Sequence, residues 1–153
     1  MAISRKIARP MMAGMFVVGG LDAVKRPDSK TEAAEPVVTP LAGPLGLPED
    51  TAQLVRINGA VQIGAGLMFA TGRLPRVAAA ALAVSLVPTT LAGHRFWEAD
   101  DDARAGQRIH FFKNLSMLGG LILAATDAEG RPSLAWRARK AAERAQRSLP
   151  GDG

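Results

Sequence analysis

The chain has 153 residues, enough for one domain, and it contains no cysteine, which excludes disulfides, iron–sulfur clusters and thiol chemistry. Tyrosine is also absent, and the apolar residues are mainly Ala, Val, Leu, Ile and Met beside 16 Gly, a composition typical of helices packed closely in lipid. The net charge of +5 arises from bases gathered at both ends of the chain. Such segregation indicates membrane topology and argues against a nucleic-acid partner.

The first predicted element is an apolar helix over residues 7–24. Basic residues precede it, as they precede the apolar part of a signal peptide. However, the segment after Gly20 lacks the small-x-small pattern that signal peptidase requires, so we expect a helix that is not cleaved.

The segment over residues 25–52 is predicted to be a polar loop outside the membrane. Ser29 and Glu32 have the spacing of a capping box, which predicts a short helix. The prolines that follow predict an irregular segment lying along the surface.

Three further apolar helices are predicted over residues 53–72, 75–93 and 109–126. Each apolar run is short for a bilayer unless the basic residues at its ends reach the head groups. The alternative is a soluble bundle, whose helices should each carry a polar stripe. Val77–Gly93 contains no charged residue on any face, so we predict an all-α four-transmembrane-helix bundle over residues 1–130.

The last segment, residues 131–153, is predicted to be a basic cytoplasmic tail. A short amphipathic helix is expected from Ser133, with Ala138, Ala141, Ala145 and Leu149 on one face. This helix could rest on anionic lipid head groups or stand solvated in water, and the sequence leaves both interpretations open.

The distribution of charge predicts the orientation. Basic residues occur before the first helix, in the tight turn Gly72–Arg76 and in the tail, whereas the two remaining loops contain more acids than bases. The positive-inside rule therefore places both termini in the cytoplasm of a bacterial cell, with the protein in the plasma membrane.

This topology gathers polar side chains near the outer boundary of the membrane. They are Asp22, Arg56, Asn58, His94, His110, Lys113 and Asn114, while Gln62 lies near the middle of the membrane. One interpretation is a shallow pocket for a quinone-like head group, in which Asp22 pairs with Arg56 or Lys113 and a histidine exchanges protons. The other is that these residues only tie helix ends together.

No catalytic constellation is apparent, because the sequence has no nucleophile elbow, paired catalytic carboxylates or phosphate-binding loop. The two histidines and Asp100–Asp102 lack tight ligand spacing, so we expect no metal site.

Several stretches resemble the DoxX family of small four-helix bacterial membrane proteins. They are Ala8–Gly20, Gly72–Ala79, Gly93–Trp97 and Phe111–Gly120, so the resemblance covers most of residues 5–126. It implies a four-helix membrane fold and an association with quinol oxidases, thiosulfate oxidation or oxidative-stress complexes. A family carboxylate in the second helix corresponds to Gln62 here, which weakens any transfer of proton or redox chemistry.

Three functional classes follow. The leading prediction is an accessory, non-catalytic subunit beside a membrane oxidase or another redox enzyme. The alternative is an oxidoreductase subunit that binds quinone or quinol at the outer polar cluster. A channel or transporter is the third, and it has little support because no continuous polar stripe crosses any helix.

Overall fold

The computed structural model describes residues 2–127, 139–140 and 143, and within them the secondary structure is entirely helical. The predicted all-α class is confirmed. Five helices follow one another in the order α1 (Ala2–Lys25), α2 (Asp28–Leu45), α3 (Thr51–Thr71), α4 (Pro75–Gly93) and α5 (Asp101–Thr126). Four of them, α1, α3, α4 and α5, are long and apolar enough to cross a membrane.

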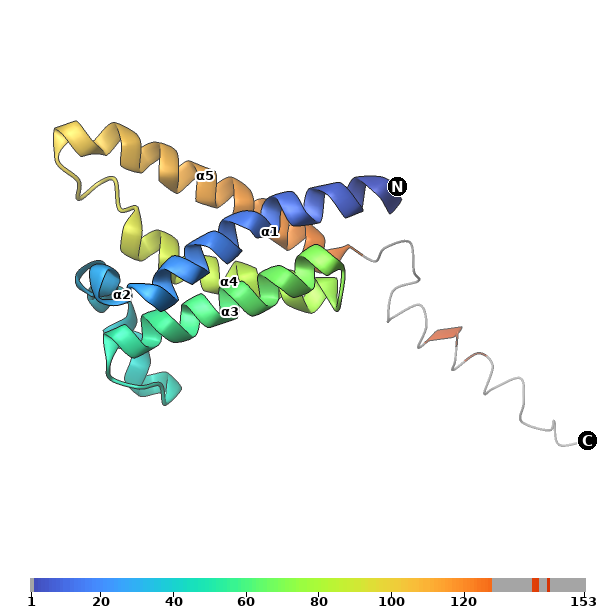
Figure 1. Cartoon of the computed structure of the whole chain (residues 1–153), viewed down its shortest axis with the longest axis horizontal. Coiled ribbons are helices and arrows are strands. Elements are labelled where there is room, and N and C mark those ends of the chain that lie inside the picture. Colours follow the sequence, from blue (N-terminus) through green and yellow to red (C-terminus); the bar gives the residue numbers. More distant parts are fainter. Residues whose placement is uncertain (1, 128–138, 141–142, 144–153) are drawn as a thin grey trace, which may run out of the picture.

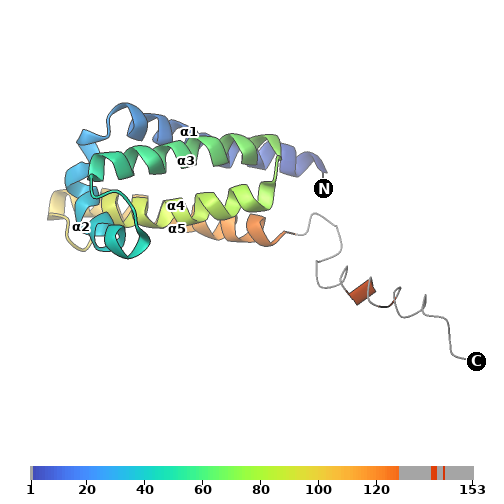
Figure 2. The same cartoon turned by 90° about the horizontal axis from the view of Figure 1, so that it is seen from below.

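The four long helices lie side by side, with α1 against α3, α3 against α4, and α4 against α5 (Figure 1). The N-terminus of α1 and the C-terminus of α5 lie at one end of this bundle, together with the turn between α3 and α4 (Figures 1 and 2). We call this the N-terminal end. The opposite end carries α2, and we call it the α2 end.

The predicted boundaries agree best for α4, which begins at Pro75 and ends at Gly93. Three helices begin earlier than predicted, α1 at Ala2, α3 at Thr51 and α5 at Asp101. In α5 the added turns carry Asp101 and Asp102, whose charges favour a helix N-terminus, and Asp101 also pairs with Arg104 at 2.7 Å. The apolar pattern could not reveal these polar turns.

The irregular segment predicted after a short helix in residues 25–52 is wrong, because most of this segment is the continuous helix α2. Ser29 does not cap it; its hydroxyl donates to the carbonyl of Arg26 at 2.7 Å, and the helix begins at Asp28. Three prolines occur inside the helix, Pro36, Pro40 and Pro44. Their four-residue spacing places them on one exposed face, so the bonds they remove all lie on the side away from the bundle.

The core of the bundle is made mainly of Ala, Leu and Phe. Leu82 and Leu121 are fully buried, and Phe16 and Phe69 pack with them. The contact between α1 and α3 is especially close: a Cβ added at Gly20 would lie 2.6 Å from the carbonyl oxygen of Gly59. Here glycine is required because a larger residue would meet backbone.

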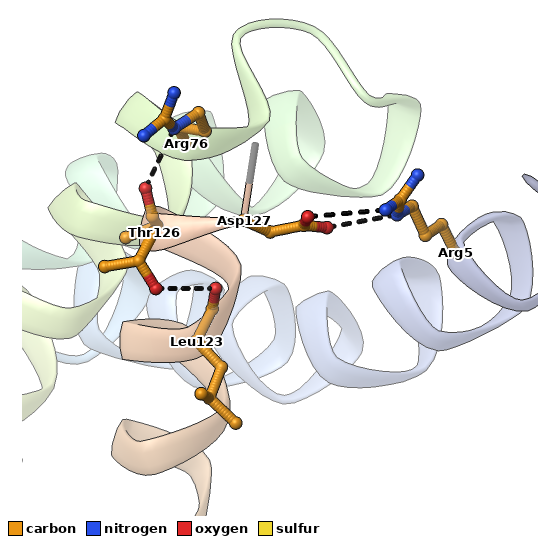
Figure 3. A network of polar contacts seen from close by, with 6 residues as sticks. Arg5, Arg76, Leu123, Thr126 and Asp127 are labelled. Atoms are coloured by element: carbon orange, nitrogen blue, oxygen red, sulfur yellow. Dashed lines mark hydrogen bonds and ion pairs between the residues drawn. The ribbon is translucent and has the colours of Figure 1, made fainter. Parts of the chain in front are cut away.

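The N-terminal end is tied by polar contacts from three parts of the chain (Figure 3). Arg5 of α1 pairs with Asp127, at 3.1 Å from Nε to Oδ2 and 3.3 Å from Nη2 to Oδ1. Arg76 of α4 donates from Nε to the carbonyl of Ala125 at 3.1 Å. The last turn of α5 is therefore held by both α1 and α4.

The predicted amphipathic helix of the basic tail lies almost entirely outside the described residues. Only Arg139, Lys140 and Glu143 of that segment are described, and all are exposed.

Candidate functional site

A network of uncharged polar side chains joins α3 to α4 inside the bundle. Asn58 and Gln62 of α3 each donate from their amide nitrogen to the Thr89 hydroxyl, at 3.0 and 3.1 Å. Ser85 donates in return to the amide oxygen of Asn58 at 2.8 Å. Gln62 and Ser85 are buried, at 5% and 4% exposed, so these contacts lie in the interior.

A second link of the same kind joins α4 to α5. The amide nitrogen of Asn114, a buried residue, donates to the Thr90 hydroxyl at 3.1 Å. Thr89 and Thr90 themselves donate to the carbonyls of Ser85 and Leu86, one turn back in α4. These bonds support α4 around Pro88, which cannot donate a backbone hydrogen bond.

The six residues of this polar network are Asn58, Gln62, Ser85, Thr89, Thr90 and Asn114, and none of them titrates near neutral pH. Hydrogen bonds between helices in a membrane contribute ~0.6 kcal/mol each. The network is therefore well suited to fixing three helices relative to one another, and it offers no acid or base of its own.

The two histidines lie together at the α2 end. The rings of His94, at the end of α4, and His110, in α5, stack with centroids 5.1 Å apart and planes 25° from parallel. His94 Nδ1 also lies 2.8 Å from the side-chain oxygen of Gln107, so in this contact Nδ1 carries a hydrogen and donates it to that oxygen.

An aromatic cluster lies next to the histidines in the sequence. Phe96 and Trp97 from the α4–α5 connection meet Phe111 and Phe112 of α5, with ring centroids between 5.2 and 6.3 Å apart. Aromatic side chains of this kind are enriched where a membrane meets water. The cluster suits the anchoring role predicted for Phe96 and Trp97.

Asp22 has other partners than those predicted. Its carboxylate accepts a short hydrogen bond from Lys30 of α2 and pairs with Arg26 at 2.7 Å. Within residues 2–127 it pairs with neither Arg56, which is exposed, nor Lys113, which is half-buried. The prediction missed Lys30 because it gave residues 25–52 only a short helix in a polar loop, whereas α2 folds back and brings Lys30 to the end of α1.

The predicted cluster is thus divided by its contacts into three groups. Asn58, Gln62 and Asn114 belong to the polar network, His94 and His110 form a stacked pair, and Asp22 forms an ion pair with α2. The network residues Ser85 and Thr89, and the histidine partner Gln107, were not among the predicted site residues. The four-residue spacing of Asn58 with Gln62, and of Ser85 with Thr89, was a usable signal because it places each pair on one helix face.

No group of three or more histidine or carboxylate side chains lies close enough to hold a metal ion in the part of the chain that the structure describes.

Comparison with known protein families shows the family to which the chain belongs. A family model described as DoxX matches residues 5–95, which run from the first turn of α1 to just beyond the end of α4. The chain belongs to the DoxX family. The resemblance seen in the sequence is therefore confirmed, and the protein is a DoxX-family membrane protein with four apolar helices long enough to cross a bilayer. No curated protein and no solved structure matches the chain.

Proposed function

We propose that this DoxX protein is an accessory, non-catalytic subunit that lies beside a membrane oxidase or another redox enzyme. The observation that supports this proposal is that the interior polar groups form hydrogen bonds between helices. The amides of Asn58, Gln62 and Asn114 are bonded to hydroxyls on neighbouring helices. Such groups stabilise the bundle, and a redox partner is what the family resemblance implies.

The proposal includes a location and an orientation. The protein lies in a bacterial plasma membrane, with residues 1–130 as the membrane domain and residues 131–153 as a basic cytoplasmic tail. Support comes from the bases at the N-terminal end, where Arg5, Lys6, Arg9, Arg73 and Arg76 occur. Basic residues next to a membrane favour the cytoplasmic side, so both termini face the cytoplasm.

The test is purification of the intact protein in a mild detergent, followed by mass spectrometry of the proteins that accompany it. We expect subunits of a membrane redox enzyme in stoichiometric amounts. An unrelated four-helix membrane protein of similar size, expressed and purified in the same way, serves as the control. Recovery of the chain alone from native membranes, or only of proteins that also accompany the control, would contradict the accessory role.

A second candidate function is binding of a quinone or quinol at the α2 end. The observation that favours it is the contact of His94 with Gln107 and the stacked ring of His110. An imidazole and an amide are suitable hydrogen-bonding partners for the carbonyl or hydroxyl of a quinone head group. This site would require the His94–Gln107 bond to open when the head group arrives.

The quinone content of the purified protein tests this alternative. Lipid extracts should contain quinone in proportion to protein, and Gln107→Leu should lower that proportion. Gln53→Leu is the matched control because Gln53 is an exposed glutamine on α3. If wild-type protein carries no more quinone than its share of the surrounding lipid, the alternative is wrong, and a co-purifying oxidase would then support the accessory role alone.

A further inference from the structure

Helix α2 has one face that is almost entirely apolar. Ala34 and Ala42 of this face are buried, and Ala34 packs in a small cluster with Ala23 of α1 and Val55 of α3. Leu41 and Leu45 share the face but are 47% and 64% exposed. The apolar face is therefore wider than the part that the bundle covers.

The opposite face of α2 requires water. Pro36, Pro40 and Pro44 lie there, and each lacks the amide hydrogen that would bond the carbonyl four residues earlier. In hydrocarbon such unsatisfied carbonyls are costly, whereas water satisfies them. Glu32, four residues before Pro36, is also exposed on this side of the helix. Polar backbone and a carboxylate thus point away from the bundle together.

The two faces of α2 lie near the ends of the candidate membrane spans. The helix packs on both α3 and α4 at the α2 end, close to where α3 begins and α4 ends (Figure 2). The turns of α3 and α4 at the α2 end also expose apolar side chains, Ile57 of α3 and Val87 and Leu91 of α4. The exposed leucines of α2 therefore lie at the same end of the bundle as apolar surface that the candidate membrane spans present.

We propose that α2 is an interfacial helix whose exposed leucines, Leu41, Leu45 and Leu47, insert among the acyl chains of the adjacent leaflet. Leu47 follows the helix, where its amide donates to the carbonyl of Ala42 at 2.9 Å and fixes the chain after the left-handed Gly46. The proline face remains in water. The partner of this surface is the lipid bilayer itself, and the inference depends on membrane location but not on any redox partner.

Single cysteines can test this directly, because the natural chain contains none. Leu41→Cys, Leu45→Cys and Leu47→Cys report on the apolar side, and Glu32→Cys and Pro40→Cys are matched controls on the opposite side. Each variant is labelled with an environment-sensitive fluorophore and reconstituted into vesicles of phosphatidylethanolamine and phosphatidylglycerol. Quenching by nitroxide-labelled lipid is then compared with quenching by aqueous iodide.

We expect the three leucine positions to be quenched severalfold more by the labelled lipid than by iodide, and the two control positions to show the reverse. Strong iodide quenching at all five positions would overturn the proposal, because α2 would then stand clear of the bilayer. Strong lipid quenching at all five would overturn it too, because the proline face would lie in hydrocarbon. Spin labels at the same positions, with oxygen and a water-soluble nickel complex as relaxers, provide a second measurement with a smaller probe.

Discussion

Thr89 shows how a single hydroxyl can organise a helix contact. It accepts hydrogen bonds from Asn58 and Gln62 of α3 and donates one to the carbonyl of Ser85. A hydroxyl has one donor and two acceptor sites, so its full capacity is used. Because the two amides come from successive turns of α3, Thr89 fixes both the rotation and the height of α4 against α3.

Replacing Thr89 by valine should therefore destabilise the bundle. The shape of the side chain is nearly preserved, while two interhelical bonds are lost at ~0.6 kcal/mol each, so we expect a loss of about 1 kcal/mol. The free energy of unfolding in mixed micelles of mild detergent and dodecyl sulfate measures this. Thr71→Val is the control, since among residues 2–127 the Thr71 hydroxyl bonds only to carbonyls of its own helix, Leu67 and Met68. Equal losses in both variants would show that the interhelical bonds contribute nothing.

Gly20 is a second position that controls helix packing, because an added Cβ atom would change the contact between α1 and α3. An added Cβ would lie 2.6 Å from the Gly59 carbonyl oxygen and 3.0 Å from a side-chain carbon of Ile63. Since the nearest atom belongs to backbone, the two helices must separate to make room. Gly14, in the same helix, has no atom within 4 Å of such a Cβ.

We expect Gly20→Ala to cost about 1–3 kcal/mol of unfolding free energy, as overpacking of a tight core does. Gly14→Ala should be neutral or slightly stabilising, because alanine favours the helix more than glycine does. The free energies of unfolding of both variants, measured in the same mixed micelles, test these two expectations. A Gly20→Ala protein as stable as the wild type would mean that α1 and α3 lie further apart than described.

Among the elements, α4 and α2 show what the sequence could and could not predict. The limits of α4 were predicted because Pro75 starts it, Gly93 ends it, and no charge occurs from Val77 to Gly93. The continuous α2 was missed because Pro36, Pro40 and Pro44 each disfavour a helix when considered singly. Only their common placement on a face away from the bundle makes the helix tolerable, and that placement depends on tertiary packing that local propensity does not contain.

The packing of α2 can be tested with two adjacent alanines. Ala34 is buried against Ala23 and Val55, whereas Ala33 is exposed. Ala34→Leu should force α2 away from α3 and α4, and amide hydrogen exchange over residues 28–45 should become severalfold faster. Ala33→Leu adds the same side chain to the same helix, so its exchange should stay close to that of the wild type. Unchanged exchange in Ala34→Leu would contradict the docking of α2 on the bundle.

In the molecule as a whole, the number of apolar spans and the family were both predictable. Four apolar runs indicated the number of spans, and motifs such as Gly72–Ala79 indicated the family. The contacts within the candidate site were harder to predict from the sequence. Its polar residues were visible in the sequence, but the pairing of Asp22 with Lys30 depends on the path of α2, and the stacking of the histidines depends on the angle at which α5 leaves α4.

The proposed orientation predicts which residues a membrane-impermeant maleimide can reach in intact cells. Asp101→Cys at the start of α5 should react readily, and Arg73→Cys in the α3–α4 turn should react only after the membrane is permeabilised. Both positions are exposed, so protein burial does not limit either reaction. The reverse pattern would place the termini outside, and equal labelling of both positions in intact cells would contradict an odd number of crossings between them.

The pairing of α1 with α3 also constrains how the protein is built. α1 makes its most extensive contact with a helix that is synthesised only after α2 and the following connection have left the ribosome. Until α3 is inserted, α1 crosses the bilayer without this partner. Gly20 and Ala23 then contact lipid, whereas in the folded bundle they contact Gly59. Since the α1 residues that contact Gly59 and Gly66 are apolar or glycine, this face can lie in lipid before α3 is inserted. The insertion of α3 then forms the first helix–helix interface of the nascent bundle.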